Sequence, residues 1–321
     1  MSLFIGIEIG GTKMQAAIGN INGDLLTVLS DQVHKKQGAL GILKWLSNNV
    51  PKLIENSQSI SEKIAAIGCG FGGPVHRHSG KVLKSNQISG WDDFQLKNWL
   101  EETFQLPAWV ENDSDAATWG EYQKGFGRGS ENFFYTNIGS GVGGGFIIKG
   151  SLYDSQGIGA GEFGHMLIPN PFPNHDDIAV EIESICSGWS IEQRLRKPGY
   201  IPKTSDLFKR VEGNVSSITT QDLGISALAG DPFALNEIDL VGRLIGIGLA
   251  NVLCLTNVEK IAVGGGVAKM GNLLLEPIRQ YTAKYYFLRN EGKYQIQQSE
   301  LGDQIVLVGS ILLTKQAYFS S

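Results

Sequence analysis

The N-terminal third of the chain alternates short apolar runs with glycine-containing turns. The runs that predict strands are residues 4–9, 13–19, 25–33, 63–70 and 108–111. Asn22-Gly23 is a strong hairpin signal between the second and third of them. The predicted helices cover residues 40–56, a stretch from a cap at Asp93 to about Phe104, and a stretch from about Ser114. This order of strands and helices is that of an α/β domain with a mixed sheet.

The rest of the chain repeats this plan with more helix. The predicted strands here are residues 132–138, 145–152, 261–263 and 305–308. Residues 153–177 form an irregular stretch, helices dominate from residue 178 to 258, and a helix ends the chain. We therefore predict two domains: a small α/β domain of residues 1–113 plus 305–321, and a large α/β domain of residues 114–304.

Composition narrows the class of protein. The 321 residues are 42% apolar and 18% charged, which is ordinary for a globular chain and excludes a disordered one. A net charge of −5 without a basic run argues against nucleic-acid binding. Residues 241–258 are the most apolar long stretch, but Arg243 and two asparagines interrupt them, which predicts a buried helix and not a membrane span. With no signal-peptide pattern and three scattered cysteines, we expect a cytoplasmic protein.

Glycine is the residue whose frequency stands out. The chain has 42 glycines, about 13% of its residues and roughly twice the usual share, and they gather in loops after apolar runs. The first loop reads Glu8-Ile9-Gly10-Gly11-Thr12-Lys13. Backbone N–H groups in such a turn can face an anion, Thr12 can hydrogen-bond phosphate, and Glu8 can hold Mg²⁺ through water. The alternative is a hairpin turn with a surface lysine.

Two further glycine loops have the same setting. Residues 139–145 fit the dinucleotide pattern Gly-x-Gly-x-x-Gly, but that fingerprint should open a helix, and the residues after it predict a strand. We therefore interpret this loop as a holder of a triphosphate or of a transferring phosphoryl group. The bare backbone of Gly264-Gly265-Gly266, after a strand, could pack against an adenine or a ribose. The alternative there is a helix that starts after a strand.

Several polar residues could carry chemistry. Asp113 follows a strand and could accept a proton from an alcohol as general base, although it or Ser114 could instead cap the next helix. Glu162 and His165 follow a glycine-rich loop and could both reach one small ligand such as a sugar, with Glu183 as a further acceptor. Zinc needs about four ligands, and no cysteine pair lies near His165.

In this order the motifs resemble those of the ROK family (repressor, open reading frame, kinase), which includes bacterial glucokinases and N-acetylhexosamine kinases. The resemblance covers nearly the whole chain. It implies an α/β, two-domain ribonuclease-H-like fold of the actin/hexokinase superfamily with an interdomain cleft, and a homodimer. It also implies an enzyme that uses ATP and Mg²⁺ to phosphorylate the 6-hydroxyl of a hexose, glucose being the first expectation.

The resemblance further implies a role for each motif. Asp113 is expected to be the catalytic base. The expected sugar-binding residues are Gly72, Gly73, Asn86, Asn112, Asp113, Glu162, His165 and Glu183. The expected ATP-binding residues are Glu8, Gly10, Gly11, Thr12, Lys13, Gly139, Ser140, Gly141, Gly143, Gly264, Gly265 and Gly266, and Glu8 would also face Mg²⁺.

The chain departs from the family pattern at two places. Glu8 stands where the family usually has Asp, which keeps the charge and lengthens the side chain by one methylene. Residues 166–182 contain no cysteine, whereas the family commonly has the zinc motif Cys-x-Cys-Gly-x-x-Gly-Cys here. We therefore expect no structural zinc, and we expect another partner, such as a carboxylate or a backbone carbonyl, to orient His165.

Other members of the family suggest alternative functions. The same fold could act on fructose, N-acetylglucosamine or N-acetylmannosamine, could use polyphosphate as donor, or could bind sugar without turnover. A family repressor would carry an N-terminal helix-turn-helix domain, for which the few residues before Glu8 leave no room.

Overall fold

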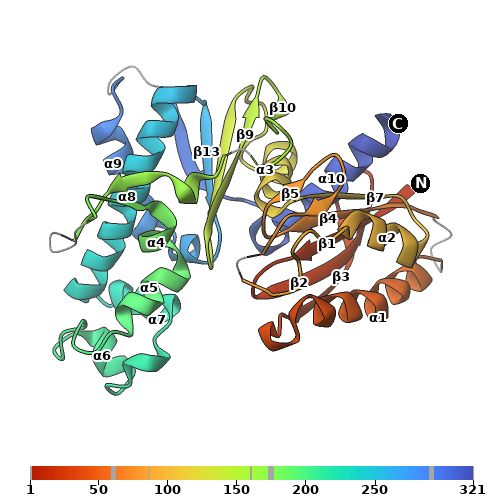
Figure 1. Cartoon of the computed structure of the whole chain (residues 1–321). Coiled ribbons are helices and arrows are strands. Elements are labelled where there is room, and N and C mark those ends of the chain that lie inside the picture. Colours follow the sequence, from red (N-terminus) through yellow and green to blue (C-terminus); the bar gives the residue numbers. More distant parts are fainter. Residues whose placement is uncertain are drawn as a thin grey trace. The chain divides into compact units, whose positions relative to one another are not determined.

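The computed structural model describes residues 2–58, 63–85, 87–159, 161–172, 177–288 and 293–320, and Figure 1 shows their secondary structure. The chain divides into two units. The first comprises Met1–Gly129, Gly145–Gly161 and Glu300–Ser321, and the second comprises Ser130–Gly144 and Glu162–Ser299. This division differs from the expected boundary at residue 113, because helix α3 (Asp113–Lys124) packs on helix α10 (Ile305–Ser320) within the first unit.

A five-stranded mixed sheet forms the centre of the first unit. In spatial order its strands are β3 (Leu25–Gln32), β2 (Lys13–Gly19), β1 (Ser2–Ile9), β4 (Lys63–Phe71) and β7 (Ala108–Asn112). β1, β2 and β3 are joined as antiparallel hairpins, and β4 runs parallel to both β1 and β7, so the predicted mixed sheet is confirmed. Ile9 pairs with Phe71, and Phe71 pairs with Asn112. The residues that follow these three strands therefore meet at one edge of the sheet.

Side-chain alternation along β1 assigns the two faces of this sheet. Ile5 and Ile7 belong to the hydrophobic core that includes residues of helix α1 (Gly38–Gln58). Gly6 points the other way, where an added Cβ would lie 2.8 Å from the carbonyl oxygen of Leu307 on α10. A helix this close to the sheet requires glycine at the contact.

The C-terminal segment corrects one sequence prediction. Residues 305–308 form the start of α10 and not a strand. The apolar run there is buried on nearly all sides, from Ile305 through Leu312, so it lacks the periodicity that separates a helix from a strand.

Short elements complete the first unit. They are the β5–β6 hairpin (Val75–His76 and Lys81–Val82), helix α2 (Leu96–Phe104), and the 3₁₀ turns Lys35–Gln37 and Gly302–Gln304. Gln95, and not Asp93, precedes the first residue of α2, and Asp93 adopts a φ of 54°. The predicted cap at Asp93 is therefore wrong.

The chain forms a second five-stranded sheet. In spatial order it contains β10 (Ser151–Leu152), β9 (Val142–Ile148), β8 (Phe133–Ile138), β13 (Lys260–Gly264) and β14 (Gln295–Gln298), of which β8, β13 and β14 belong to the second unit. β13 runs parallel to both β8 and β14. A separate small hairpin pairs β11 (Leu167–Pro169) with β12 (Ala179–Glu181). The stretch that the sequence predicted to be irregular thus contains one strand of this hairpin.

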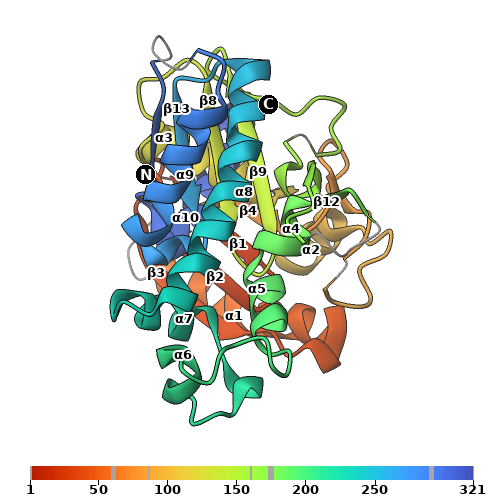
Figure 2. The same ribbon diagram turned by 90° about the vertical axis from the view of Figure 1, so that its left-hand side faces the viewer.

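Helices make up most of the second unit. They are α4 (Ile182–Cys186), α5 (Gly188–Leu195), α6 (Asp206–Arg210), α7 (Thr220–Leu228), α8 (Pro232–Thr256) and α9 (Asn272–Tyr285), with 3₁₀ turns at Phe163–His165, Val215–Ser217 and Val267–Met270. α8 and α9 lie along each other (Figure 2), and an added Cβ on Gly242 would come within 2.5 Å of Pro277. Among the described residues, α8 alone is long and apolar enough to cross a membrane, but 61% of its apolar window is buried inside the structure, as in a core helix.

Candidate functional site

The first glycine loop is a closed turn between β1 and β2. The Gly10 N–H donates to the Lys13 carbonyl over 3.0 Å, and Thr12 is exposed. The Lys13 ammonium lies 3.2 Å from Glu8 Oε2 and donates to the Asp303 carbonyl over 3.0 Å. A cavity of about 750 Å³ opens beside the turn, within the range of small-molecule sites. It is lined by Gly11, Thr12, Lys13, Ser30, Asp31, Gln32, Val33 and Lys35.

Glu8 is a buried carboxylate with another carboxylate nearby. Burial raises the pKa of Glu8 to about 7, the Lys13 ammonium opposes this rise, and the charges of Asp113 and Asp303 add to it. The negative charge of Asp113 therefore disfavours the ionised form of Glu8. A hard divalent cation would relieve that repulsion, and carboxylate oxygens are the ligands that Mg²⁺ prefers. These residues fit the predicted magnesium role of Glu8.

Asp113 begins helix α3 at the edge of the sheet where β1, β4 and β7 end. Its Oδ2 lies 3.3 Å from the point where a Cβ on Gly72 would be, and Gly72 N–H donates to the Ile9 carbonyl over 2.8 Å. The first turn of a helix favours a negative charge, which suits an acceptor of protons. The structure thus brings together three predicted site elements: the Gly10 turn, Gly72 and Asp113.

Asn112, and not Asp113 or Ser114, caps α3. Its Oδ1 accepts from the backbone N–H groups of Ser114 (2.8 Å) and Asp115 (3.2 Å). Its Nδ2 donates to the Gly73 carbonyl over 3.0 Å, which ties β7 to the Gly72-Gly73 loop. Asp113 is therefore not needed as the helix cap, which was the alternative to a catalytic role. Ser114 Oγ donates to Asp113 Oδ1 over 3.3 Å.

An ion-pair network behind Asn112 was not predicted from the sequence. Arg77, after β5, places Nε 2.7 Å from Glu111 Oε2 and Nη1 3.0 Å from Asp154 Oδ2. Glu111 is buried, which raises its pKa to about 7; Arg77 opposes the rise, and Asp154 adds to it. The Asn112 N–H donates to Glu111 Oε1 over 3.2 Å. The sequence signal that could have indicated this network was Glu111, an acidic residue near the end of an otherwise apolar strand.

The second glycine loop, in the second unit, covers residues 139–141 and not the predicted 139–145, because β9 begins at Val142. Its backbone is held by neighbouring backbone groups. Gly139 N–H donates to the Gly141 carbonyl over 2.8 Å, and Gly188 N–H donates to the Gly139 carbonyl over 2.7 Å. Glu183 Oε2 accepts from the Val142 N–H over 2.7 Å and would lie 2.5 Å from a Cβ on Gly141. Glu183, which the resemblance assigns to the sugar, therefore also supports the predicted phosphate loop.

The third glycine loop is a position where only glycine fits. Gly265 has a φ of 89°, and an added Cβ would lie 2.5 Å from the backbone of Ile138 at the end of β8. Gly266, in contrast, has nothing within 4 Å of an added Cβ. The second and third loops therefore meet at the ends of β8 and β13, which run parallel.

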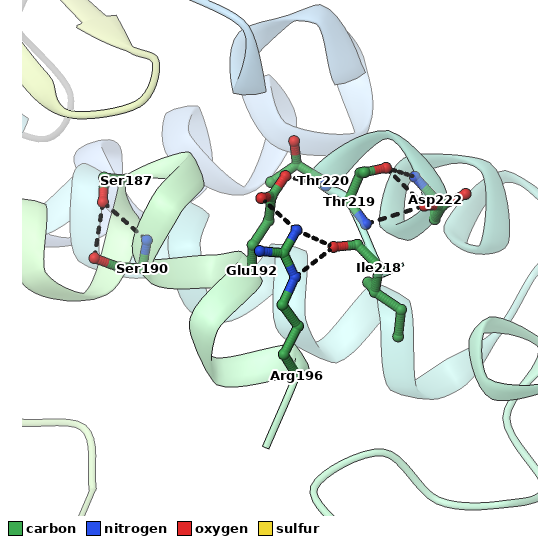
Figure 3. Close-up of polar contacts among 8 residues, drawn as sticks. All are labelled: Ser187, Ser190, Glu192, Arg196, Ile218, Thr219, Thr220 and Asp222. Carbon is green, nitrogen blue, oxygen red and sulfur yellow. Dashed lines mark hydrogen bonds and ion pairs between the residues drawn. The ribbon is translucent and has the colours of Figure 1, made fainter. Parts of the chain in front are cut away.

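Hydrogen bonds join the C-terminal end of helix α5 to the start of helix α7 near these loops. Arg196, just after α5, donates from Nε (3.0 Å) and Nη2 (2.7 Å) to the Ile218 carbonyl (Figure 3). Glu192 accepts from Arg196 and from the Thr220 N–H (Figure 3). An added Cβ on Gly224 of α7 would come within 3.4 Å of Met270, in the 3₁₀ turn after the third loop.

The predicted sugar motif lies at the surface of the second unit. Glu162 and His165 are both exposed, at the two ends of the Phe163–His165 turn. His165 Nδ1 lies 3.3 Å from Glu181 Oε2, at the end of β12. A carboxylate thus lies beside His165, and a carboxylate is one of the two kinds of partner expected there from the sequence. Asn86, the remaining predicted sugar ligand, lies outside the described residues.

Comparison with known proteins identifies the family. The ROK family model matches residues 4–317, nearly the whole chain. The chain belongs to the ROK family. A glucokinase of Halalkalibacterium halodurans is 30% identical over 315 residues, which cover 98% of this ROK chain and 95% of the relative.

Two further relatives show how far the ROK likeness reaches. A solved ROK family glucokinase from Streptomyces griseus, in complex with glucose and AMPPNP, has a TM-score of 0.83 and 29% identity, and the match covers 98% of this chain and 99% of that one. The predicted α/β fold of the actin/hexokinase type is confirmed. A putative xylose repressor of Caldicellulosiruptor sp. strain Rt8B.4 is 26% identical over 98% of this chain, which covers 78% of the repressor.

Proposed function

We propose that this ROK protein is a hexose kinase that transfers the γ-phosphoryl group of ATP to the 6-hydroxyl of glucose. The observation that carries the proposal is the meeting of Asp113, Gly72 and the Gly10 turn at one sheet edge, with Asp113 close enough for its charge to raise the pKa of Glu8. An acceptor of protons, an anion-binding turn and a carboxylate for a cation are what phosphoryl transfer to an alcohol requires.

Asp113 acts as the general base in this proposal. Its carboxylate accepts the proton of the 6-hydroxyl as that oxygen bonds to the γ-phosphorus, while the bond to the ADP oxygen breaks. The α3 N-terminus favours the anionic form of Asp113, and the Asn112 cap fixes the start of the helix. General-base help of this kind is worth roughly 10²- to 10⁴-fold.

The glycine loops and Glu8 serve the phosphate side. Gly10, Gly11 and Thr12 in the first unit, and Gly139, Ser140, Gly141 and Gly143 in the second, are the proposed phosphate-binding groups. Gly264-Gly265-Gly266 is the proposed adenosine loop. Glu8 would hold Mg²⁺, which neutralises phosphate charge when bound. Lys13, paired with Glu8, keeps that carboxylate in place.

The proposed sugar ligands are Gly72, Gly73, Asn86, Asn112, Asp113, Glu162, His165 and Glu183. The glucokinase names of relatives support glucose as the first sugar to test. We also propose a cytoplasmic homodimer, which size-exclusion chromatography with light scattering tests for the oligomeric state.

One assay tests the proposed function. ADP release from ATP and Mg²⁺ would be measured with glucose, mannose, fructose, N-acetylglucosamine and N-acetylmannosamine, with an Asp113→Asn variant as control. We expect a rate that depends on glucose and that the variant loses. If another hexose led, the kinase assignment would stand and the sugar would change. If every sugar gave only background hydrolysis, with ATP and with polyphosphate, the kinase proposal would be overturned.

A further inference from the structure

The zinc-binding cysteine motif that the family commonly carries beside its motif histidine is absent from this chain. Residues 166–182 contain no cysteine. In the part of the chain that the structure describes, no three His, Cys, Asp or Glu side chains gather as a metal site. Zinc needs about four ligands, three of them from the protein even at an open site. The cysteine ligands of that motif are therefore not available to orient His165 through a zinc ion.

The β11–β12 hairpin supplies a different partner for His165. β11 begins two residues after His165, and Leu167 on it pairs with Glu181 at the end of β12. The Ile182 N–H donates to the Met166 carbonyl over 3.1 Å, so the strand pairing continues past Glu181. This register places Glu181 Oε2 3.3 Å from His165 Nδ1.

The contact has a chemical consequence for the imidazole ring. An ionised carboxylate accepts hydrogen bonds and cannot donate them, so Glu181 at 3.3 Å favours the tautomer with the hydrogen on Nδ1. In a neutral imidazole the other nitrogen, Nε2, is then an acceptor. An acceptor at Nε2 suits a sugar hydroxyl, which donates. The carboxylate thus favours one orientation and one tautomer of the ring, the role that outer-shell carboxylates play for histidines at metal sites.

We propose that Glu181 is a positioning residue that orients His165 for sugar binding in place of the zinc ion of other ROK proteins. The inference rests on the proposed sugar site and not on turnover. His165 and Glu181 keep 52% and 49% of their side-chain surface exposed, so the pair contributes little to the free energy of unfolding. Its effect is therefore expected in sugar affinity alone.

The test is a mutant cycle read by calorimetric glucose binding and by kinetics. Glu181→Ala should weaken glucose binding and raise the glucose KM by about 10-fold, with little change in kcat or in the thermal midpoint. Glu181→Gln should stay within about 3-fold of wild type, because its amide oxygen still accepts from Nδ1. In a His165→Ala background, Glu181→Ala should have no further effect, because Glu181 acts only through that ring.

A matched control and a metal assay complete the design. Asp177→Ala removes an exposed carboxylate from the other end of the same hairpin and should leave glucose affinity unchanged. Zinc well below one ion per chain supports the inference; one ion per chain, with chelation weakening glucose binding, would overturn it. Glucose affinity unchanged in Glu181→Ala, or lowered equally with and without His165, would overturn it too. A wild type that binds glucose without releasing ADP would overturn only the kinase proposal, and a wild type that binds none of the five hexoses of the panel would overturn both.

Discussion

The two units hold their candidate site residues by different means. In the first unit, the carboxylates around Asp113 are largely buried and are paired with partly buried cations: Glu8 with Lys13, and Glu111 with Arg77. In the second, Glu162 and His165 are exposed. Burial makes the first set costly to disturb, because a desolvated charge without its partner is strongly unfavourable. Solvent screens the second set, so its residues can change with little effect on the fold.

Because of this difference, substitutions in the two units should affect stability and sugar binding differently. Changes to the buried pairs should affect the free energy of unfolding and activity together, whereas changes to the exposed pair should affect sugar affinity alone. Asp113 is an exception to this rule for the first unit, since it lies beside the buried pairs but is not the helix cap. Its substitution should abolish activity at almost no structural cost.

The largest expected effect is that of Asp113→Asn on turnover. The amide keeps the shape of the side chain but cannot accept the proton, so kcat should fall by at least roughly 10²-fold. Asn112 still caps α3, so the thermal midpoint should change little. Steady-state ADP release and thermal unfolding measure the two quantities. A kcat within a few-fold of wild type would show that another group is the base.

Arg77→Met comes next and should affect stability in a pH-dependent way. Burial raises the pKa of Glu111 to about 7, above its unfolded value of 4.5, so the stability that a protonated Glu111 provides is complete below 4.5 and is lost as pH rises through 7. Without Arg77 the ionised carboxylate lacks its partner, and the loss at pH 8 should reach about 3 kcal/mol. At pH 5 the loss should be smaller.

Urea unfolding at the two pH values measures this effect. The double variant Arg77→Met/Glu111→Gln is the control, because it removes the carboxylate and should remove the difference between pH 5 and pH 8. Lys81, in the same β5–β6 hairpin as Arg77, forms an ion pair with the exposed Asp93. Lys81→Met should therefore cost at most about 1 kcal/mol at either pH. An Arg77→Met loss that is equal at pH 5 and pH 8 would contradict the role assigned to Glu111.

Two neighbouring glycines test the third loop. Gly265→Ala forces a side chain into a φ of 89° and against the backbone of Ile138, so it should cost about 2 kcal/mol or more. Gly266→Ala meets nothing within 4 Å and should leave stability unchanged. If Gly266→Ala nevertheless raises the KM for ATP, the added methyl group meets the nucleotide and not the protein. An unchanged KM would remove Gly266 from the adenosine loop.

The sequence predicted the first glycine turn well because its signal is local, whereas three glycines of the predicted second loop belong to β9. A short apolar run that ends in glycines, such as residues 4–11, needs no distant residue to be recognised as a strand and its turn. The start of α10 was mispredicted for a related reason, since a helix buried on nearly every side has no polar face to show its period. The pairs Arg77–Glu111 and His165–Glu181 join residues from different elements, and only the folded chain brings them together.

Arg196→Met has a small expected effect, and together with Arg194→Met it compares an exposed ion pair with a buried one at the same helix. Arg196 keeps 38% of its side chain exposed, so loss of its bonds to the Ile218 carbonyl and Glu192 should cost only about 1 kcal/mol. Arg194, on α5 itself, is buried against Glu237 at 3.0 Å, and Arg194→Met should cost about 3 kcal/mol or more. Urea unfolding compares the two variants directly. Equal losses would mean that burial does not decide how strongly an ion pair matters in this protein, and the contrast between the two units would lose its physical basis.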